Sequence, residues 1–139
     1  MNQPFETVEL PLDATLPVAL LVEDEPLVAM VAEESLRCIG YEPVVAASGA
    51  SAIDVVQRGL APVFALIDIG LPDMRGDDLV PRLRSLQPIL PVLIVSGYAE
   101  SDLRARFAGD PSVAVVTKPY TEADLVRAAR TLGVPCEDV

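Results

Sequence analysis

This sequence alternates five short apolar runs with stretches of helical spacing, and that alternation constrains its fold more than any other feature. The runs are almost continuously apolar, so the strands they predict are buried on both faces. Strands of this kind form parallel sheets that carry helices on each side. The sequence therefore predicts one α/β domain around a five-stranded parallel sheet. The predicted strands are 17–22, 41–47, 62–67, 91–96 and 112–116.

A helix is predicted after each strand, and polar residues mark where several helices begin. Ser48, Asp77 and Thr121 are the expected N-caps, and Thr121 with Asp124 resembles a capping box. Pro81 is expected in the first turn of the helix that Asp77 opens, where its missing N–H does little harm. The predicted helices are 26–40, 48–58, 77–86, 101–107 and 121–132.

The two ends of the chain are set apart from the predicted domain. Residues 1–15 are interpreted as an N-terminal tail, although their segment FETVEL alternates and could form an added edge strand. Residues 16–133 form the predicted domain, and residues 134–139 a C-terminal tail. Within the domain, Pro43 indicates that the strand 41–47 lies at a sheet edge, because proline cannot donate to a ladder.

Composition excludes several functions. The chain has 139 residues, a net charge of −11, no histidine and two cysteines. Without histidine, there is no histidine-based acid–base catalysis, histidine metal site or phosphohistidine carrier. Residues 1–78 hold fourteen of the 21 acidic residues but three of the 10 basic ones. A cation or a basic partner is therefore expected, and direct nucleic-acid binding is not.

No apolar run is long enough to cross a bilayer, and the N-terminus lacks the apolar segment of a signal peptide. The sequence therefore predicts a cytoplasmic location without membrane association.

Polar residues follow four of the predicted strands. Glu23 and Asp24 follow the first strand, Asp68 ends the third, Ser96 ends the fourth and Lys118 follows the fifth. The carboxyl ends of parallel strands share one edge, and the strand order 2-1-3-4-5 predicts a site between strands one and three. Converging carboxylates need a cation, and oxygen ligands without histidine or cysteine suit Mg²⁺. Lysine, a hydroxyl and Mg²⁺ together neutralise a phosphoryl group, which an aspartate can accept.

Each of these groups also has a simpler interpretation. The acidic run 23–25 could serve only as a favourable helix start. Asp68 could be a solvated loop carboxylate, and Ser96–Gly97 a turn. The conjunction of four strand ends favours a site that accepts phosphate on a carboxylate.

Four segments resemble the receiver domain of two-component response regulators, and the match covers residues 16–133. The resemblance implies a flavodoxin-like (βα)5 three-layer sandwich with a sheet of order 2-1-3-4-5. The variants DIGLPDM and SGYAE look most like single-domain receivers, or receivers associated with hybrid kinases, of alphaproteobacteria. The matching segments are LLVEDEPLV, LIDIGLPDMRGDDL, PVLIVSGYAE and VVTKPYTEADL.

The resemblance implies a role for each matching residue of the site. Asp68 would accept the phosphoryl group. Asp24, Asp68 and the backbone carbonyl of Gly70 would ligate Mg²⁺. Glu23 would hold a metal-bound water or orient the metal, and Lys118 would pair with the phosphoryl group.

The resemblance also implies a switch made of Ser96, Gly97, Tyr98 and Val115. Ser96 would donate its hydroxyl to the phosphoryl oxygens in the active state. Val115 stands where the family often has an aromatic residue, and Tyr98 could serve in its place. The Lys118–Pro119 bond is expected to be cis, as in the family.

The predicted function is that of a phospho-accepting receiver in a two-component phosphorelay. A sensor histidine kinase or histidine phosphotransfer protein would donate the phosphoryl group, and helix four, strand five and helix five would present a switched surface to a downstream protein. The chain would catalyse its own phosphorylation and dephosphorylation without being a turnover enzyme, and no DNA-binding output domain is expected. The alternative is a receiver-like module that binds partners without phosphorylation.

Overall fold

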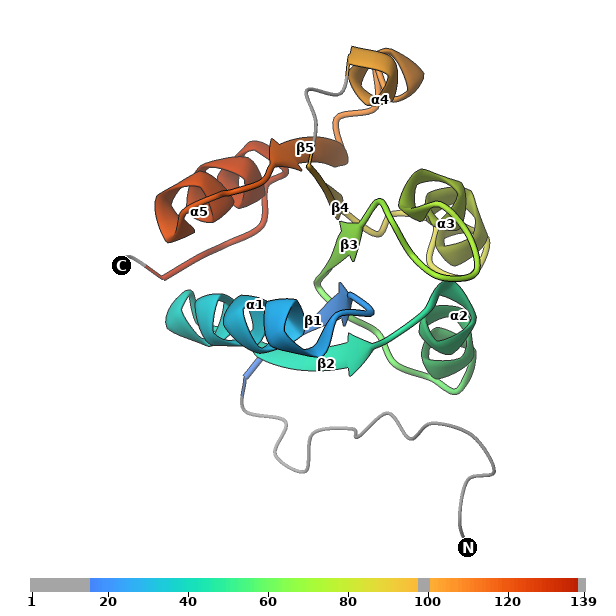
Figure 1. The fold of residues 1–139 in the computed structure, drawn as a ribbon, viewed down its shortest axis with the longest axis horizontal. Helices are drawn as coiled ribbons and strands as arrows, with labels where there is room; N and C mark the ends of the chain where they lie inside the picture. The colour runs from blue at the N-terminus through green and yellow to red at the C-terminus, as the bar shows by residue number, and fades with distance from the viewer. Residues whose placement is uncertain (1–15, 98–100, 138–139) are drawn as a thin grey trace, which may run out of the picture.

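A computed structural model describes residues 16–97 and 101–137 of the chain. Within these ranges, five parallel strands form one sheet in the order β2-β1-β3-β4-β5, with a helix after each strand (Figure 1). This confirms the predicted flavodoxin-like sandwich and its strand order. The elements are β1 (Val18–Val22), α1 (Pro26–Cys38), β2 (Glu42–Ala46), α2 (Gly49–Gln57), β3 (Phe64–Asp68), α3 (Gly76–Arg84), β4 (Val92–Ser96), α4 (Ser101–Arg106), β5 (Val113–Thr117) and α5 (Glu122–Thr131).

The sheet separates two apolar cores, which explains why the strand sequences are apolar without a break. Leu20 and Val22 of β1 pack on the side of α2, α3 and α4. Ala19 and Leu21 of the same strand pack on the side of α1 and α5. Because successive side chains of a strand point to opposite faces, a strand covered on both faces needs apolar residues throughout.

At the β2 edge of the sheet, the neighbouring segments pack into the core. Pro43 lies in β2, which is an edge strand as the sequence predicted. Beside β2, Tyr41 is buried, packs edge-on against Phe64 and donates a hydrogen bond from its hydroxyl to the Pro135 carbonyl. Val134 is buried in the same core. Residues 134–135 therefore lie against the β2 side of the domain.

Two of the predicted helix starts are confirmed. The Ser48 hydroxyl accepts a hydrogen bond from the Ser51 N–H at 3.0 Å. Thr121 and Asp124 form a capping box, with bonds of 2.9 and 3.1 Å.

The predicted start of α3 is wrong. Its N-cap is Arg75, so Asp77 lies inside the first turn and Pro81 in the second turn. Asp77 is buried and pairs with Arg75 at 3.0 Å and with Arg106 of α4 at 2.7 Å. The helix begins earlier because Gly76 can approach the end of β3: a Cβ there would lie 2.3 Å from the Asp68 carbonyl oxygen.

Candidate functional site

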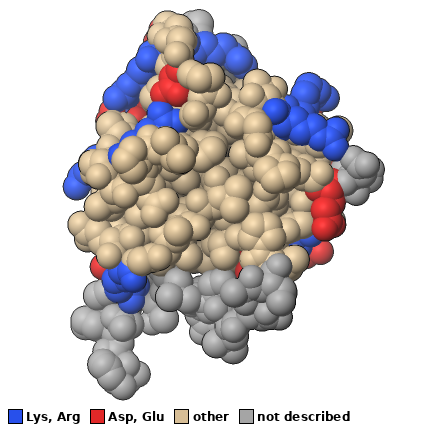
Figure 2. Space-filling view, turned by 180° about the vertical axis from the view of Figure 1, so that it is seen from behind, with Lys and Arg blue, Asp and Glu red and all other residues tan. Residues whose placement is uncertain are grey.

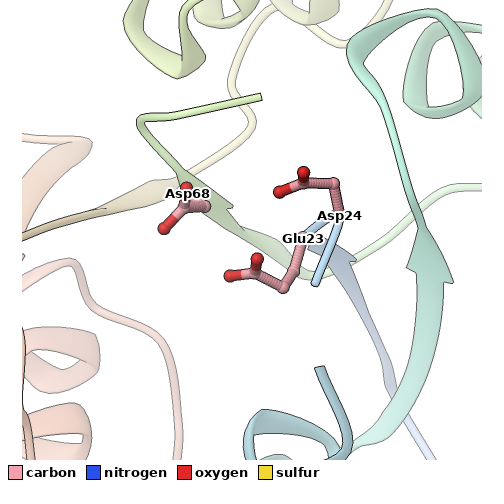
Figure 3. Close-up of side chains that lie close together, drawn as sticks. All are labelled: Glu23, Asp24 and Asp68. Atoms are coloured by element: carbon pink, nitrogen blue, oxygen red, sulfur yellow. The ribbon is translucent and has the colours of Figure 1, made fainter. Parts of the chain in front are cut away.

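Three carboxylates meet where β1 and β3 end. Glu23 and Asp24 follow β1, Asp68 is the last residue of β3, and their side chains converge (Figure 3). One oxygen from each carboxylate lies within 4.8 Å of the others. Glu23 and Asp68 are buried, whereas Asp24 is exposed. The predicted convergence of these three residues is therefore found in the structure.

The two carboxylate oxygens of Asp68 have different partners. Its Oδ2 accepts a hydrogen bond from the Gly70 N–H at 2.8 Å. Its Oδ1 is buried and forms an ion pair with Lys118 Nζ at 2.6 Å. A carboxylate oxygen in an ion pair keeps lone pairs that can bind a cation or attack an electrophile.

Lys118 is positioned by its own backbone. Its N–H donates to the Ser96 carbonyl at 2.7 Å, and the bond to Pro119 is cis, as predicted. Its Nζ also lies 3.9 Å from Glu23 Oε1. Burial alone would lower the pKa of Lys118, but pairing with Asp68 and Glu23 outweighs it and raises that pKa. The ammonium therefore stays charged between two carboxylates.

Glu23 shows that the cluster holds an excess of negative charge. Burial raises the pKa of the Glu23 carboxyl, and the nearby charges of Asp68 and Asp24 raise it further. The Glu25 N–H, which donates to Glu23 at 3.1 Å, and Lys118 act in the opposite direction. A divalent cation among the carboxylates would relieve this repulsion.

The donor set fits Mg²⁺. It offers three hard carboxylate groups, and Asp24 is exposed, so the ion can keep several waters. Gly70 lies at the same strand end and forms an isolated bridge with Arg75. The residues that would hold the ion are thus Asp24 and Asp68, with Glu23 beside them.

The predicted switch residues lie at different depths. Ser96 is fully buried at the end of β4, and Gly97 after it is exposed. Tyr98 lies outside the described residues. Val115 is half-buried in the middle of β5, where it packs toward the core of α2, α3 and α4. The structure therefore places Ser96 beside the site and Val115 farther along the edge strand.

Two contacts at the site were missed by the sequence analysis. Tyr120 lines a small cavity together with Glu23, Asp68 and Lys118, and burial raises the pKa of its hydroxyl. The position of Tyr120, two residues after Lys118, was the sequence signal that could have placed it at the site. Asp73, in the loop after β3, accepts hydrogen bonds from backbone N–H groups at the start of α2.

The carboxylate of Asp73 closes the N-terminus of α2. It accepts hydrogen bonds from the N–H groups of Gly49 and Ala50, both at 2.9 Å. Burial would raise the pKa of Asp73, but these two bonds hold it below its usual value. The loop that follows Asp68 is thereby fixed to α2, a contact between residues too far apart in sequence for a local pattern to reveal.

Comparison with known proteins identifies the family. The sequence matches the response regulator receiver domain over residues 19–130. This chain therefore belongs to the response regulator receiver domain family. The crystal structure of a response regulator receiver protein from Sinorhizobium medicae WSM419 is similar, with a TM-score of 0.75 and 26% identity, over 87% of this chain and 98% of that one.

Longer relatives contain a domain of this kind. The probable transcriptional regulatory protein TcrX of Mycobacterium tuberculosis is 36% identical over 115 residues, which are 81% of this chain and 48% of that protein. The sensor kinase CckA of Brucella abortus is 31% identical over 114 residues, 81% of this chain and 12% of the kinase. The chain thus spans about half of the first relative and a small part of the second.

Membership of the family carries general properties. Receiver domains generally bind Mg²⁺ at an acidic pocket, and Glu23, Asp24 and Asp68 form an acidic cluster in this chain. They interact with sensor histidine kinases or phosphotransfer proteins. Among the helices that the structure describes, none has the length and apolar character needed to cross a membrane.

Proposed function

We propose that this receiver accepts a phosphoryl group on Asp68 from the phosphohistidine of a sensor kinase or a phosphotransfer protein. The observation that carries the proposal is the buried Asp68 carboxylate, whose Oδ1 pairs with Lys118 Nζ at 2.6 Å and which converges with Glu23 and Asp24. In the transfer, an oxygen of Asp68 forms a bond to phosphorus while the phosphorus–nitrogen bond breaks, and the imidazole nitrogen keeps the electron pair.

The residues around Asp68 supply the charge balance for that transfer. Mg²⁺, when bound, neutralises charge on the phosphoryl oxygens. Asp24 and Asp68 would hold the metal, together with the carbonyl of Gly70, and Glu23 would orient it. Lys118 leaves its contact with the carboxylate and pairs with the phosphoryl group, to which Ser96 donates its hydroxyl.

The phosphorylated protein is a switch rather than a turnover enzyme. Water later attacks the acyl phosphate, which returns the Asp68 carboxylate and inorganic phosphate. Until then, Ser96 and the surface of α4, β5 and α5 adopt a second arrangement that a downstream protein recognises. A protein partner fits better than nucleic acid, because the chain carries a net charge of −11.

Intact-mass measurement tests the acceptor and the metal together. The chain is incubated with acetyl phosphate and Mg²⁺, beside Asp68→Asn and a control, Asp54→Asn, which removes an exposed carboxylate that pairs with Arg58 on α2. We expect one added phosphoryl group in the wild type and in Asp54→Asn, and none in Asp68→Asn or without Mg²⁺. Absence of the added mass, together with no Mg²⁺-dependent binding of beryllofluoride, would favour the module that binds without phosphorylation.

A further inference from the structure

The outer side of β5 carries backbone groups that no strand of the described ranges pairs. On the inner side, the Ser112 carbonyl accepts from the Val92 N–H at 2.8 Å, and the Lys118 N–H donates to the Ser96 carbonyl at 2.7 Å. In a parallel pair, alternate residues turn their backbone groups toward the partner strand. Even-numbered residues of β5 therefore face β4, and the N–H and C=O groups of Val115 and Thr117 face outward.

A groove lies along this outer side. Its volume is about 560 Å³, and all five residues of β5 line it. Arg104 and Phe107 form the wall at α4, and Arg127 and Ala128 form the wall at α5. We call this feature the edge groove. Its volume is in the range of ligand-binding clefts, and it gives direct access to the backbone of β5.

The sequence explains why the edge groove is open. α4 has six residues, and its side chain Leu103 anchors it in the core beside α3. The floor of the groove is formed by small side chains, with Val115 at its centre and Ala114 beside it. No large side chain of β5 therefore fills the space between α4 and α5, and β5 stays partly exposed, whereas β4 beside it is wholly buried.

The charge of the edge groove is opposite to that of the chain. Arg104 and Arg127 line it with one carboxylate, Asp124, which pairs with Arg127 at 3.0 Å. The whole chain has a net charge of −11. Figure 2 shows Lys and Arg side chains gathered at the end of the molecule where Figure 1 places α4 and β5, above a broad uncharged face. A segment that enters the groove thus meets Arg104 and the Arg127–Asp124 ion pair, and acidic side chains would complement the excess positive charge.

From these observations we propose that the edge groove binds an extended, acidic segment of a partner protein, which adds to β5 as a sixth strand. The N–H and C=O groups of Val115 and Thr117 pair with its backbone, and Arg104 and Arg127 pair with its carboxylates. This assignment deepens the proposed function, since it rests on that function for the role of the contact and gives the chemistry of the downstream partner.

The opposite edge of the sheet offers an internal control. The Glu42 N–H donates to Pro17 and the Ala46 carbonyl accepts from Glu23, so the backbone of Pro43 faces outward from β2. Proline has no N–H to offer an added strand. Placing a proline in β5 and removing the proline from β2 therefore distinguishes strand addition from non-specific binding of the peptide.

The test uses the 139-residue chain and a fluorescent, capped peptide of alternating valine and glutamate. We expect saturable binding by anisotropy, with the Val115 and Thr117 amides protected from hydrogen exchange. A matched peptide with lysine in place of glutamate should bind about tenfold more weakly, since two arginine contacts are lost. Equal binding of the two peptides, or protection elsewhere than on β5, would overturn the proposal.

Variants locate the contact. Val115→Pro removes one outward-facing N–H without touching the β4 ladder and should abolish binding, whereas Pro43→Val should leave it unchanged. The double variant Arg104→Glu/Arg127→Glu keeps the strand intact and should reverse the preference between the two peptides. Retained preference for the acidic peptide in that double variant contradicts the assignment, even if Val115→Pro fails to fold.

Two other possible occupants of the edge groove would give different results. If a second copy fills the groove, sedimentation shows a dimer that Val115→Pro dissociates. If residues 1–15 fill it, Glu6→Lys/Glu9→Lys raises the affinity for the acidic peptide by about tenfold. Either result overturns the assignment to a partner protein.

Peptide binding is also measured on Asp68→Asn, which separates the two proposals. Binding by this variant supports the edge groove whatever the mass experiment shows. If neither the wild type nor Asp68→Asn binds the peptide, but the wild type is phosphorylated as expected, only the edge-groove proposal is rejected.

Discussion

The β2 edge and the β5 edge of the same sheet differ in their outward-facing residues and in their burial. At β2, one of the two outward positions is a proline, and Tyr41 beside the strand is buried against Phe64 and the Pro135 carbonyl. At β5, the outward positions are Val115 and Thr117, and the edge groove leaves the strand half-open. The comparison indicates that apolar burial stabilises the β2 side, whereas the β5 side leaves its strand free for contacts.

Polar contacts replace part of that burial on the β5 side. Arg84, at the end of α3, donates from Nε to the Leu90 carbonyl at 3.1 Å and from Nη2 to the Ser112 carbonyl at 3.0 Å. It also pairs with Asp110. One side chain thus ties α3 to the segments that precede β4 and β5, without covering the outer side of β5.

The largest difference between the edges is expected for truncation of an apolar contact. Tyr41→Ala should lower the free energy of unfolding by about 3–5 kcal/mol, because a buried aromatic ring is replaced by a cavity. Val115→Ala, on the half-exposed strand, should lower it by about 1 kcal/mol. Urea denaturation of both variants measures the two values, and equal losses would contradict the contrast drawn between the edges.

A smaller effect is expected where the β5 side depends on polar contacts. Arg84→Met should lower the free energy of unfolding by about 2 kcal/mol, because the Leu90 and Ser112 carbonyls and Asp110 each lose a hydrogen bond from the guanidinium. Arg58→Met removes an exposed ion pair with Asp54 and should change it by less than about 0.5 kcal/mol. If thermal and urea unfolding show the same loss of stability for both variants, the stabilising role assigned to Arg84 is wrong.

The smallest effect concerns pH and the β2 side. Burial raises the pKa of Tyr41 to about 12, with a further contribution from Cys136. Since the folded pKa lies above the unfolded value of about 10, this contribution to stability is complete below pH 10 and is lost as pH rises toward 12. At pH 11 the wild type should have lost about 1 kcal/mol more than Tyr41→Phe. Parallel pH profiles of urea midpoints would refute this interpretation.

The sequence predicted the elements, their order and the meeting of the carboxylates, because each depends on local patterns and on one rule of sheet geometry. Asp68 and Lys118 could be placed together since both follow strands of a parallel sheet. Asp77 was misread as a cap because its partner Arg106 lies on another helix and leaves no local signal. The edge groove depends on how α4 and α5 stand on either side of β5, which no sequence period encodes.

The contact between Asp73 and α2 has a consequence for protein engineering. The carboxylate of Asp73 binds the N–H groups of Gly49 and Ala50, so the acceptor loop and the start of α2 form one unit. A chimera that transplants residues 68–76 alone would carry the Asp73 carboxylate without the two helix amides that donate to it. The smallest portable module of this receiver therefore contains two separate pieces of chain, the acceptor loop and residues 48–51.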